Sequence, residues 1–127
     1  EAGDPLFLHR LPVQEFLPPG GQGVIAIECL TNNLKDLESL LSPLNCSKTE
    51  KECNTERAFL HHLGASCDTP IAAMATDINH GKIELQARYW KEGEVIPITG
   101  LEIGDEPAEV AKNLVNRLNL VSQSPLN

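Results

Sequence analysis

The sequence predicts an α+β fold: a three-stranded antiparallel sheet with helices packed on one face, preceded by a linker, a strand and a helix severed from a larger α/β domain. Three observations lead to this prediction. Residues 82–90 alternate between apolar and polar side chains, as a half-buried strand does. Apolar side chains recur at helical spacing over 47–63 and again after Asp105. Turn-forming residues at 79–81 and 91–93 separate the strands closely enough for an antiparallel meander.

The first part of the chain has the composition of a connection. Pro-Pro-Gly-Gly at 18–21 cannot lie inside a helix or a central strand. Residues 24–29 begin with a continuous apolar run, which predicts a strand buried on both faces. Leucines spaced by three, four and three residues predict a helix over 34–44, which Pro43 helps to end. Because a buried strand needs neighbours that the linker cannot supply, we expect this segment to have been cut from something larger.

Residues 45–127 are expected to form a C-terminal domain, which begins with a helix from 47 to 63. Ser47 followed by Glu50 has the spacing of a capping box at the start of this helix. Gly64 follows the last apolar position and is a suitable C-cap, because glycine adopts the left-handed conformation there readily.

Three strands are predicted at 71–78, 82–90 and 94–100. Pro97 lacks an amide hydrogen and would place the third strand at a sheet edge. On the middle strand, one face is apolar: Ile83, Leu85, Ala87 and Tyr89.

A last helix is predicted after the third strand, with Asp105 as its N-cap and with Pro107 and Glu109 in its first turn. Its apolar stripe is made by Ala111, Leu114, Val115 and Leu118. The tail 122–127 is expected to fray.

Composition argues against several functional classes. The chain has 127 residues, which is enough to form a hydrophobic core without stabilising disulfides or metal ions. Its net charge of −8 disfavours binding to nucleic acid or to anionic membranes. No apolar run approaches the ~18–20 residues that a membrane span needs. Residues 1–5 lack the basic and apolar regions of a signal peptide. The four cysteines include no CxxC pair, so we expect reduced thiols in a cytoplasmic protein.

Two further motifs carry little chemistry. The glycine-rich run at 20–23 precedes a predicted strand, whereas phosphate-binding loops follow a strand and open a helix, so a tight turn or hinge is expected. His61 and His62 are adjacent on a predicted helix and point about 100° apart, so they cannot share one ion from one face. We therefore predict no metal site.

Cys67 is the most informative single residue. It lies in a predicted loop at 64–70, between a capped helix and a strand, and such loops expose their side chains. Free cysteines, however, are most often buried and inert, and no histidine that could act as a base is near in the loop. From this context alone, an inert thiol is the favoured interpretation and a reactive one is the alternative.

Three ordered segments resemble the C-terminal part of the hydroxymethylbilane synthase family, also called porphobilinogen deaminases. They are LPPGGQGVIAIEC at 17–29, LSPLN at 41–45 with TERAFL at 55–60, and GASCDTPIA at 64–72. Their order and approximate spacing also match, and the resemblance covers nearly the whole chain. It implies that 1–44 are an interdomain connection plus the C-terminal remnant (strand and helix) of the first domain, and that 45–127 are the C-terminal cofactor-attachment domain.

The resemblance implies a transferase that condenses four porphobilinogen units into a linear tetrapyrrole and releases ammonia. It also implies a dipyrromethane cofactor attached by a thioether to the loop cysteine, which is Cys67 here. A soft thiolate suits this bond, because it adds to the electrophilic methylene left when ammonia departs from a pyrrole. Ala65 and Ser66 replace the family's commoner glycines, which keeps small residues beside the thiol.

The resemblance assigns three more cofactor-binding residues. Arg57 aligns with a family arginine associated with the acidic side chains of the pyrroles, although an ordinary surface arginine is an equal alternative. Gln22 and Gly23 match a turn near the family's active cleft. The family's catalytic aspartate lies in two preceding domains, so we expect no catalytic residue in this chain, no activity without those domains, and as partners only those domains, porphobilinogen and the growing polypyrrole.

Two other functional classes remain open. The chain could be a non-enzymatic α+β binding or regulatory domain that shares the scaffold. It could also be a thiol-based redox protein that uses Cys67, which is disfavoured because no resolving cysteine is near in the sequence.

Overall fold

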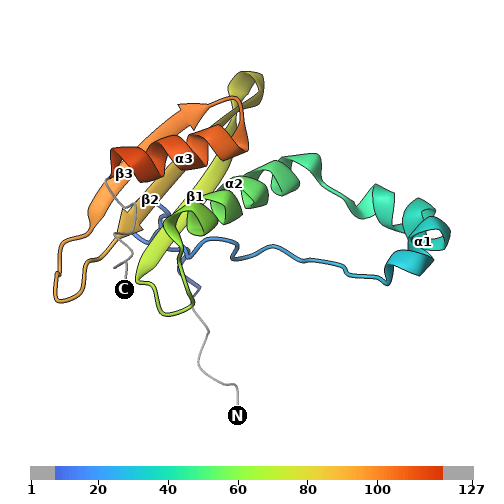
Figure 1. Cartoon of the computed structure of the whole chain (residues 1–127), viewed down its shortest axis with the longest axis horizontal. Helices are drawn as coiled ribbons and strands as arrows, with labels where there is room; N and C mark the ends of the chain where they lie inside the picture. Colours follow the sequence, from blue (N-terminus) through green and yellow to red (C-terminus); the bar gives the residue numbers. More distant parts are fainter. Residues whose placement is uncertain (1–7, 119–127) are drawn as a thin grey trace, which may run out of the picture.

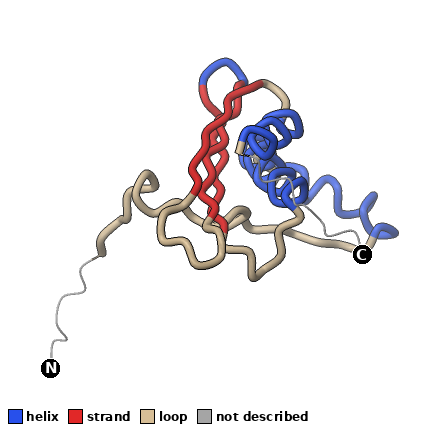
Figure 2. The backbone as a smooth tube through the Cα atoms, turned by 60° about the vertical axis from the view of Figure 1, so that its left-hand side comes forward, coloured by secondary structure: helices blue, strands red, loops and turns tan. Residues whose placement is uncertain are grey.

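The computed structural model describes residues 8–118. The helices and strands are α1 (Leu34–Leu41), α2 (Ser47–Leu63), β1 (Ile71–Ile78), β2 (Lys82–Tyr89), β3 (Ile98–Gly104) and α3 (Pro107–Arg117). The strands form one antiparallel sheet in the order β1-β2-β3, and α2 and α3 cover one of its faces (Figure 1, Figure 2). The predicted α+β class is therefore confirmed. No helix within 8–118 is long and apolar enough to cross a membrane.

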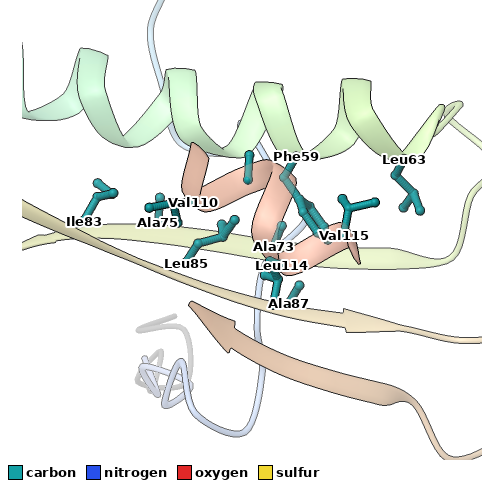
Figure 3. Packing of buried hydrophobic residues seen from close by; sticks show 11 residues of the cluster. Phe59, Leu63, Ala73, Ala75, Ile83, Leu85, Ala87, Val110, Leu114 and Val115 are labelled. Atoms are coloured by element: carbon teal, nitrogen blue, oxygen red, sulfur yellow. The ribbon is translucent and has the colours of Figure 1, made fainter. Parts of the chain in front are cut away.

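The core lies between the two helices and the sheet. The register pairs Ala73 with Ala87 and Ala75 with Leu85, so alternate residues of β1 and β2 face the helices. Figure 3 shows side chains from α2, α3 and the sheet meeting around Phe59, which is fully buried. The buried cluster contains Phe59, Leu63, Ala73, Ala75, Ile83, Leu85, Ala87, Val110, Ala111, Leu114 and Val115.

Helix α3 lies very close to β3 because two glycines face it. A Cβ atom at Gly100 would lie 2.8 Å from Cδ1 of Leu114, and one at Gly104 would lie 2.7 Å from Cγ2 of Val110. At the end of the helix, Nη2 of Arg117 lies 2.5 Å from Oε2 of Glu102 on β3. Small residues on the strand thus set the distance between these two elements.

The third strand begins later than the sequence predicts. Residues 94–97 form a loop, and the side chains of Val95 and Ile96 are 88% and 81% exposed. Pairing with β2 starts where Ile98 meets Tyr89 and continues to Gly104. Tyr89 is the last residue of β2, and Pro97 has no amide hydrogen to donate, so neither favours pairing before Ile98. The strand does lie at an edge of the sheet, as predicted.

Both predicted N-caps are displaced by one residue. Cys46 rather than Ser47 occupies the N-cap position of α2, and Glu50 accepts a hydrogen bond from Nδ2 of Asn45 at 2.8 Å instead of closing a capping box. Glu106 rather than Asp105 is the N-cap of α3. Pro107 is the first residue of α3, where its missing amide hydrogen costs no intrahelical bond.

The strand predicted at 24–29 does not form. These residues lie in a loop, and the side chains of Ile25 and Ile27 are 91% and 59% exposed. The described residues offer this segment no neighbouring strand, and a strand is stable only when its amide and carbonyl groups are paired. Within 8–118, no strand therefore pairs with this apolar segment.

The helix predicted at 34–44 forms in part. The α-helical portion ends at Leu41, and Ser42–Leu44 continues as a 3-10 turn in which Pro43 occupies an early position. Figure 1 shows α1 set apart from the sheet, joined to α2 by this turn and by a short connection. The tail predicted to fray, 122–127, lies outside the described residues.

Candidate functional site: the Cys67 loop and the turn beside α2

The loop that carries Cys67 is defined by the end of α2. Gly64 adopts the left-handed conformation with φ of 68°, as predicted, and its amide donates to the carbonyl of His61. The loop is then closed by Ser66 and Thr69: the Thr69 amide donates to the Ser66 carbonyl at 3.1 Å, and the Ser66 amide donates to Oγ1 of Thr69 at 2.9 Å. Cys67 lies between these two residues, exposed and with a free thiol.

A shallow hollow of about 440 Å³ lies beside this loop. Its wall includes Trp90 and Tyr89 from the end of β2, together with Asp68 and Glu92. The Trp90 amide donates to the carbonyl of Pro70 at 3.0 Å, which fixes the loop to the sheet. Cys67 is exposed and does not line this hollow.

The turn at 20–23 is tied to α2 and β1 by Glu56. The Gly21 amide donates to Oε2 of Glu56 at 2.6 Å, and the Ala75 amide on β1 donates to Oε1 at 2.8 Å. Only 8% of Glu56 is exposed. Burial raises the pKa of its carboxyl group above the usual value, an effect that outweighs the two amide hydrogen bonds. This predicted tight turn therefore belongs to the C-terminal fold.

The structure brings Arg57 and Gly23 to one hollow and Gln22 to an adjoining one. Arg57 is exposed on α2 and borders a hollow of about 460 Å³ that Gly23 also lines. Gln22 and Gly23 line an adjoining hollow of about 270 Å³. Cys67 lines neither, and it follows α2 by four residues. Since α-helical residues rise about 1.5 Å each, roughly 9 Å of helix separates Arg57 from Leu63.

The four cysteines are free thiols. Cys29, Cys46 and Cys67 are exposed, and Cys53 is half-buried on α2. Thr49, whose hydroxyl and backbone amide face the sulfur, lowers the pKa of the Cys46 thiol below its usual value. Cys46 is therefore a second exposed thiol with enhanced thiolate character, which the sequence analysis did not single out although its position just before a helix was a signal.

The two adjacent histidines contact one another edge to face. Their ring centroids lie 6.1 Å apart with planes at 73°. In the part of the chain that the structure describes, no three His, Cys, Asp or Glu side chains gather closely enough to hold a metal ion.

Sequence reasoning missed Glu56 and the contacts of the linker. Arg88 on β2 donates to the carbonyls of Gln14 and Glu15, and the Pro18 carbonyl accepts from the Ala73 amide at 3.0 Å. These bonds join residues far apart in sequence, and nothing in the composition of the linker indicates them. Glu56 did carry a weak signal, because it lies beside Thr55 and one turn from Phe59 on the buried side of α2.

Comparison with known proteins identifies the family of this chain. Residues 50–119 match the family model described as the C-terminal domain of porphobilinogen deaminase. A porphobilinogen deaminase of Bacillus cereus (strain AH820) is 37% identical over 102 residues, covering 80% of this chain and 33% of the relative. One from Bacillus thuringiensis subsp. konkukian is 37% identical over 115 residues, covering 91% of this chain and 37% of the relative. The chain thus spans about a third of the length of the curated relatives it matches. It belongs to the porphobilinogen deaminase family, of which it carries the C-terminal domain.

Proposed function

We propose that this chain is the cofactor-bearing C-terminal part of a hydroxymethylbilane synthase, a cytoplasmic transferase of tetrapyrrole and haem biosynthesis. Cys67 would hold dipyrromethane through a thioether. The observation that carries the proposal is the position of Cys67: a free, exposed thiol between Ser66 and Thr69 in a loop fixed at both ends, in a chain of this family.

The residues around Cys67 fit a covalent pyrrole cofactor. The thiol is exposed, so a bulky group can be attached without displacing the core. Its neighbours Ala65 and Ser66 are small and leave the backbone accessible. When bound, dipyrromethane supplies the end of the chain to which porphobilinogen units are added. The residues of this domain would hold that cofactor in place.

Arg57, Gln22 and Gly23 would contact the acidic side chains of the cofactor or of the growing polypyrrole. A guanidinium offers a fork of charged donors that matches a carboxylate. Arg57 is exposed at the hollow that Gly23 also lines, which supports the proposal that the two would contact one ligand. The distance along α2 means that Arg57 would meet a ring remote from the thioether.

The chemistry of condensation would be completed by preceding domains. The net charge of −8 is unfavourable for a polycarboxylate ligand, so most of the cationic lining would come from those domains. They would also supply the aspartate that manages protons at the pyrrole. This chain would contribute the tether and, through Arg57, one cation.

The experiment tests where the cofactor is attached. This chain and the amino-terminal two-thirds of a curated relative are produced together as two separate polypeptides. Porphobilinogen is added, and the mass of this chain is then measured by intact-mass spectrometry after denaturation. We expect a mass increase of two pyrrole units. The Cys67→Ser variant should lose this adduct, whereas Cys46→Ser should keep it, because both thiols are exposed and only one is in the attachment loop.

The relative's own C-terminal portion, supplied in the same way, serves as the positive control. An adduct on Cys46 or Cys29, or no adduct on this chain while the control acquires one, would show that the proposed attachment is wrong. Arg57→Ala should leave the adduct in place and raise the porphobilinogen concentration needed for half-maximal turnover. Arg57→Lys should restore only part of that loss, since an ammonium lacks the planar fork.

A further inference from the structure

We infer that Glu56 is a positioning residue: its carboxylate bridges the turn at 20–23 and strand β1, and so holds Gly23 at the hollow that Arg57 also borders. The part of this inference that concerns ligand binding rests on the proposed function. The bridge itself stands on the structure of this chain.

The bridge consists of two hydrogen bonds to one side chain. Oε2 of Glu56 accepts from the Gly21 amide at 2.6 Å, and Oε1 accepts from the Ala75 amide at 2.8 Å. Glu56 belongs to α2, Ala75 to β1 and Gly21 to the incoming linker, so one carboxylate joins three segments. Bonds of this kind, from backbone amides to an ionised carboxylate, are about twice as strong as those between neutral groups.

A carboxylate is the group that this position requires. Two backbone donors point at the two oxygens, and an ionised carboxylate accepts at both without presenting a hydrogen. A glutamine would direct its amide hydrogens at one of the two donors and leave that amide unpaired. Because only 8% of Glu56 is exposed, water cannot readily replace the lost partner.

The turn packs closely against α2 at this point. A Cβ atom at Gly20 would lie 3.0 Å from Cδ1 of Leu60 and 3.6 Å from Cβ of Glu56. Gly21 has a φ of 79°, a conformation that favours glycine. Beyond Gly23 the chain runs into an exposed loop, so the Glu56 bridge is an anchor close to the point where the linker leaves the domain.

The surroundings of Glu56 are acidic rather than cationic. The hollow that Glu56 lines also contains Glu52 and Cys53 from α2, and the Glu52 charge adds to burial in raising the pKa of Glu56. Oε1 of Glu52 accepts one amide hydrogen bond, from Asp77 at 2.8 Å, and pairs with Lys48 at 3.9 Å. Glu52 is therefore a matched control, because it is a carboxylate on the same helix that accepts a hydrogen bond from only one backbone amide among the described residues.

The bridge is tested on the full chain by amide hydrogen exchange and heteronuclear NMR. In Glu56→Gln we expect the Gly21 amide to exchange at least about tenfold faster, the change that loss of one hydrogen bond worth about 1.4 kcal/mol would give. In Glu52→Gln the Gly21 amide should exchange as in the unmodified chain. In the unmodified chain, the Gly21 and Ala75 amide resonances should shift together with pH, with one midpoint above the usual value for glutamate.

The pH titration uses the unmodified chain, so it tests the bridge even if Glu56→Gln does not fold. Separate midpoints for Gly21 and Ala75, or no shift in either, would overturn the bridge. So would equal Gly21 exchange rates in the Gln variants at 56 and 52.

The positioning role is tested in the two-chain enzyme described above. Displacing a ligand-binding turn by about 1 Å can cost on the order of a hundredfold in rate, so Glu56→Gln should slow porphobilinogen turnover by about ten- to a hundredfold. Gly100→Ala, which strains the opposite side of the core under α3, should lower stability without this loss. If the two variants lose turnover equally, Glu56 contributes only to stability and is not a positioning residue. If the amide results hold while no adduct forms at Cys67, the proposed function fails and the bridge stands.

Discussion

The amide of Gly21 lies 2.6 Å from Oε2 of Glu56, although 35 residues separate them in the chain. This contact, together with the bond from the Ala73 amide to the Pro18 carbonyl, makes the last part of the linker an integral element of the C-terminal fold. The surface that carries Gln22, Gly23 and Arg57 therefore exists only when linker, helix and sheet are assembled.

The burial of Glu56 predicts a specific pH dependence of stability. Its pKa in the folded chain is raised above the ordinary value of 4.5, so the folded state binds this proton more tightly than the unfolded state does. The resulting stabilisation is fully present below the ordinary pKa and is lost as the pH rises through the raised one. Urea unfolding between about pH 4 and pH 8 should show the unmodified chain losing stability relative to Glu56→Gln. Parallel pH profiles for the two proteins would contradict this.

Thr49 is expected to control the reactivity of Cys46. Removing its hydroxyl in Thr49→Val raises the Cys46 pKa, because the thiolate loses a hydrogen-bond donor. At neutral pH the rate of Cys46 alkylation by iodoacetamide should fall severalfold, because a smaller fraction of the thiol is then ionised. Peptide mass mapping measures the rate. Thr69→Val, which alters the Cys67 loop instead, should leave the Cys46 rate unchanged.

Gly100→Ala should destabilise the domain. The new methyl group would lie 2.8 Å from Cδ1 of Leu114 and 2.7 Å from Cδ2 of Leu118, and Leu114 is fully buried and cannot move freely. Overpacking of this kind costs about 1–3 kcal/mol, measurable by urea unfolding. Thr99→Ala, at an exposed neighbouring position on the same strand, should change stability by less than about 0.5 kcal/mol. Similar values for the two variants would show that α3 can shift away from β3.

Gly64→Ala measures how much stability depends on the left-handed conformation at the end of α2. A Cβ atom there would meet no atom within 4 Å, so any loss arises from the φ of 68° alone. We expect a loss of about 1 kcal/mol, with most of it recovered in Gly64→Asn, because asparagine tolerates the left-handed region better than alanine. Thermal unfolding of the three proteins checks this, and equal stability of the Ala and Asn variants would argue that the loop adapts.

The chain by itself is expected to be inactive with porphobilinogen. This expectation rests on the proposed function, in which preceding domains supply the catalytic aspartate and most of the cationic groups. A turnover assay on material free of other chains should give no hydroxymethylbilane, and the two-chain mixture is the matched positive control. Product formed by this chain alone would show that the proposed division of labour is wrong.

The elements with strong periodic patterns were predictable. Residues 82–90 alternate so regularly that both the strand and its buried face were confirmed, because one side of β2 must pack against the helices. The helix at 47–63 and its end at Gly64 were confirmed for a similar reason, since glycine is the residue that readily adopts the left-handed cap. Local chemistry decided these elements.

The errors occurred where pairing decides the structure. The apolar run at 24–29 has strand composition but no neighbour in the described residues, and β3 begins at Ile98 because the register with Tyr89 fixes its start. The sequence of a single segment reveals neither which strand it pairs with nor the register of that pairing. At the site, the exposure of Cys67 in a loop agreed with the prediction, whereas its role as an attachment point stays a prediction.

The sequence by itself determined the fold class, the middle strand, the long helix with its glycine cap and the loop that presents Cys67, since each depends on residues close together in the chain. Only the tertiary structure decided that the linker turn is tied to Glu56, that Gly23 and Arg57 border one hollow, and that Gly100 allows α3 to approach β3. These relationships join residues far apart in the chain. They arise because buried amides must find acceptors and packed surfaces must fit, conditions that only the assembled fold imposes.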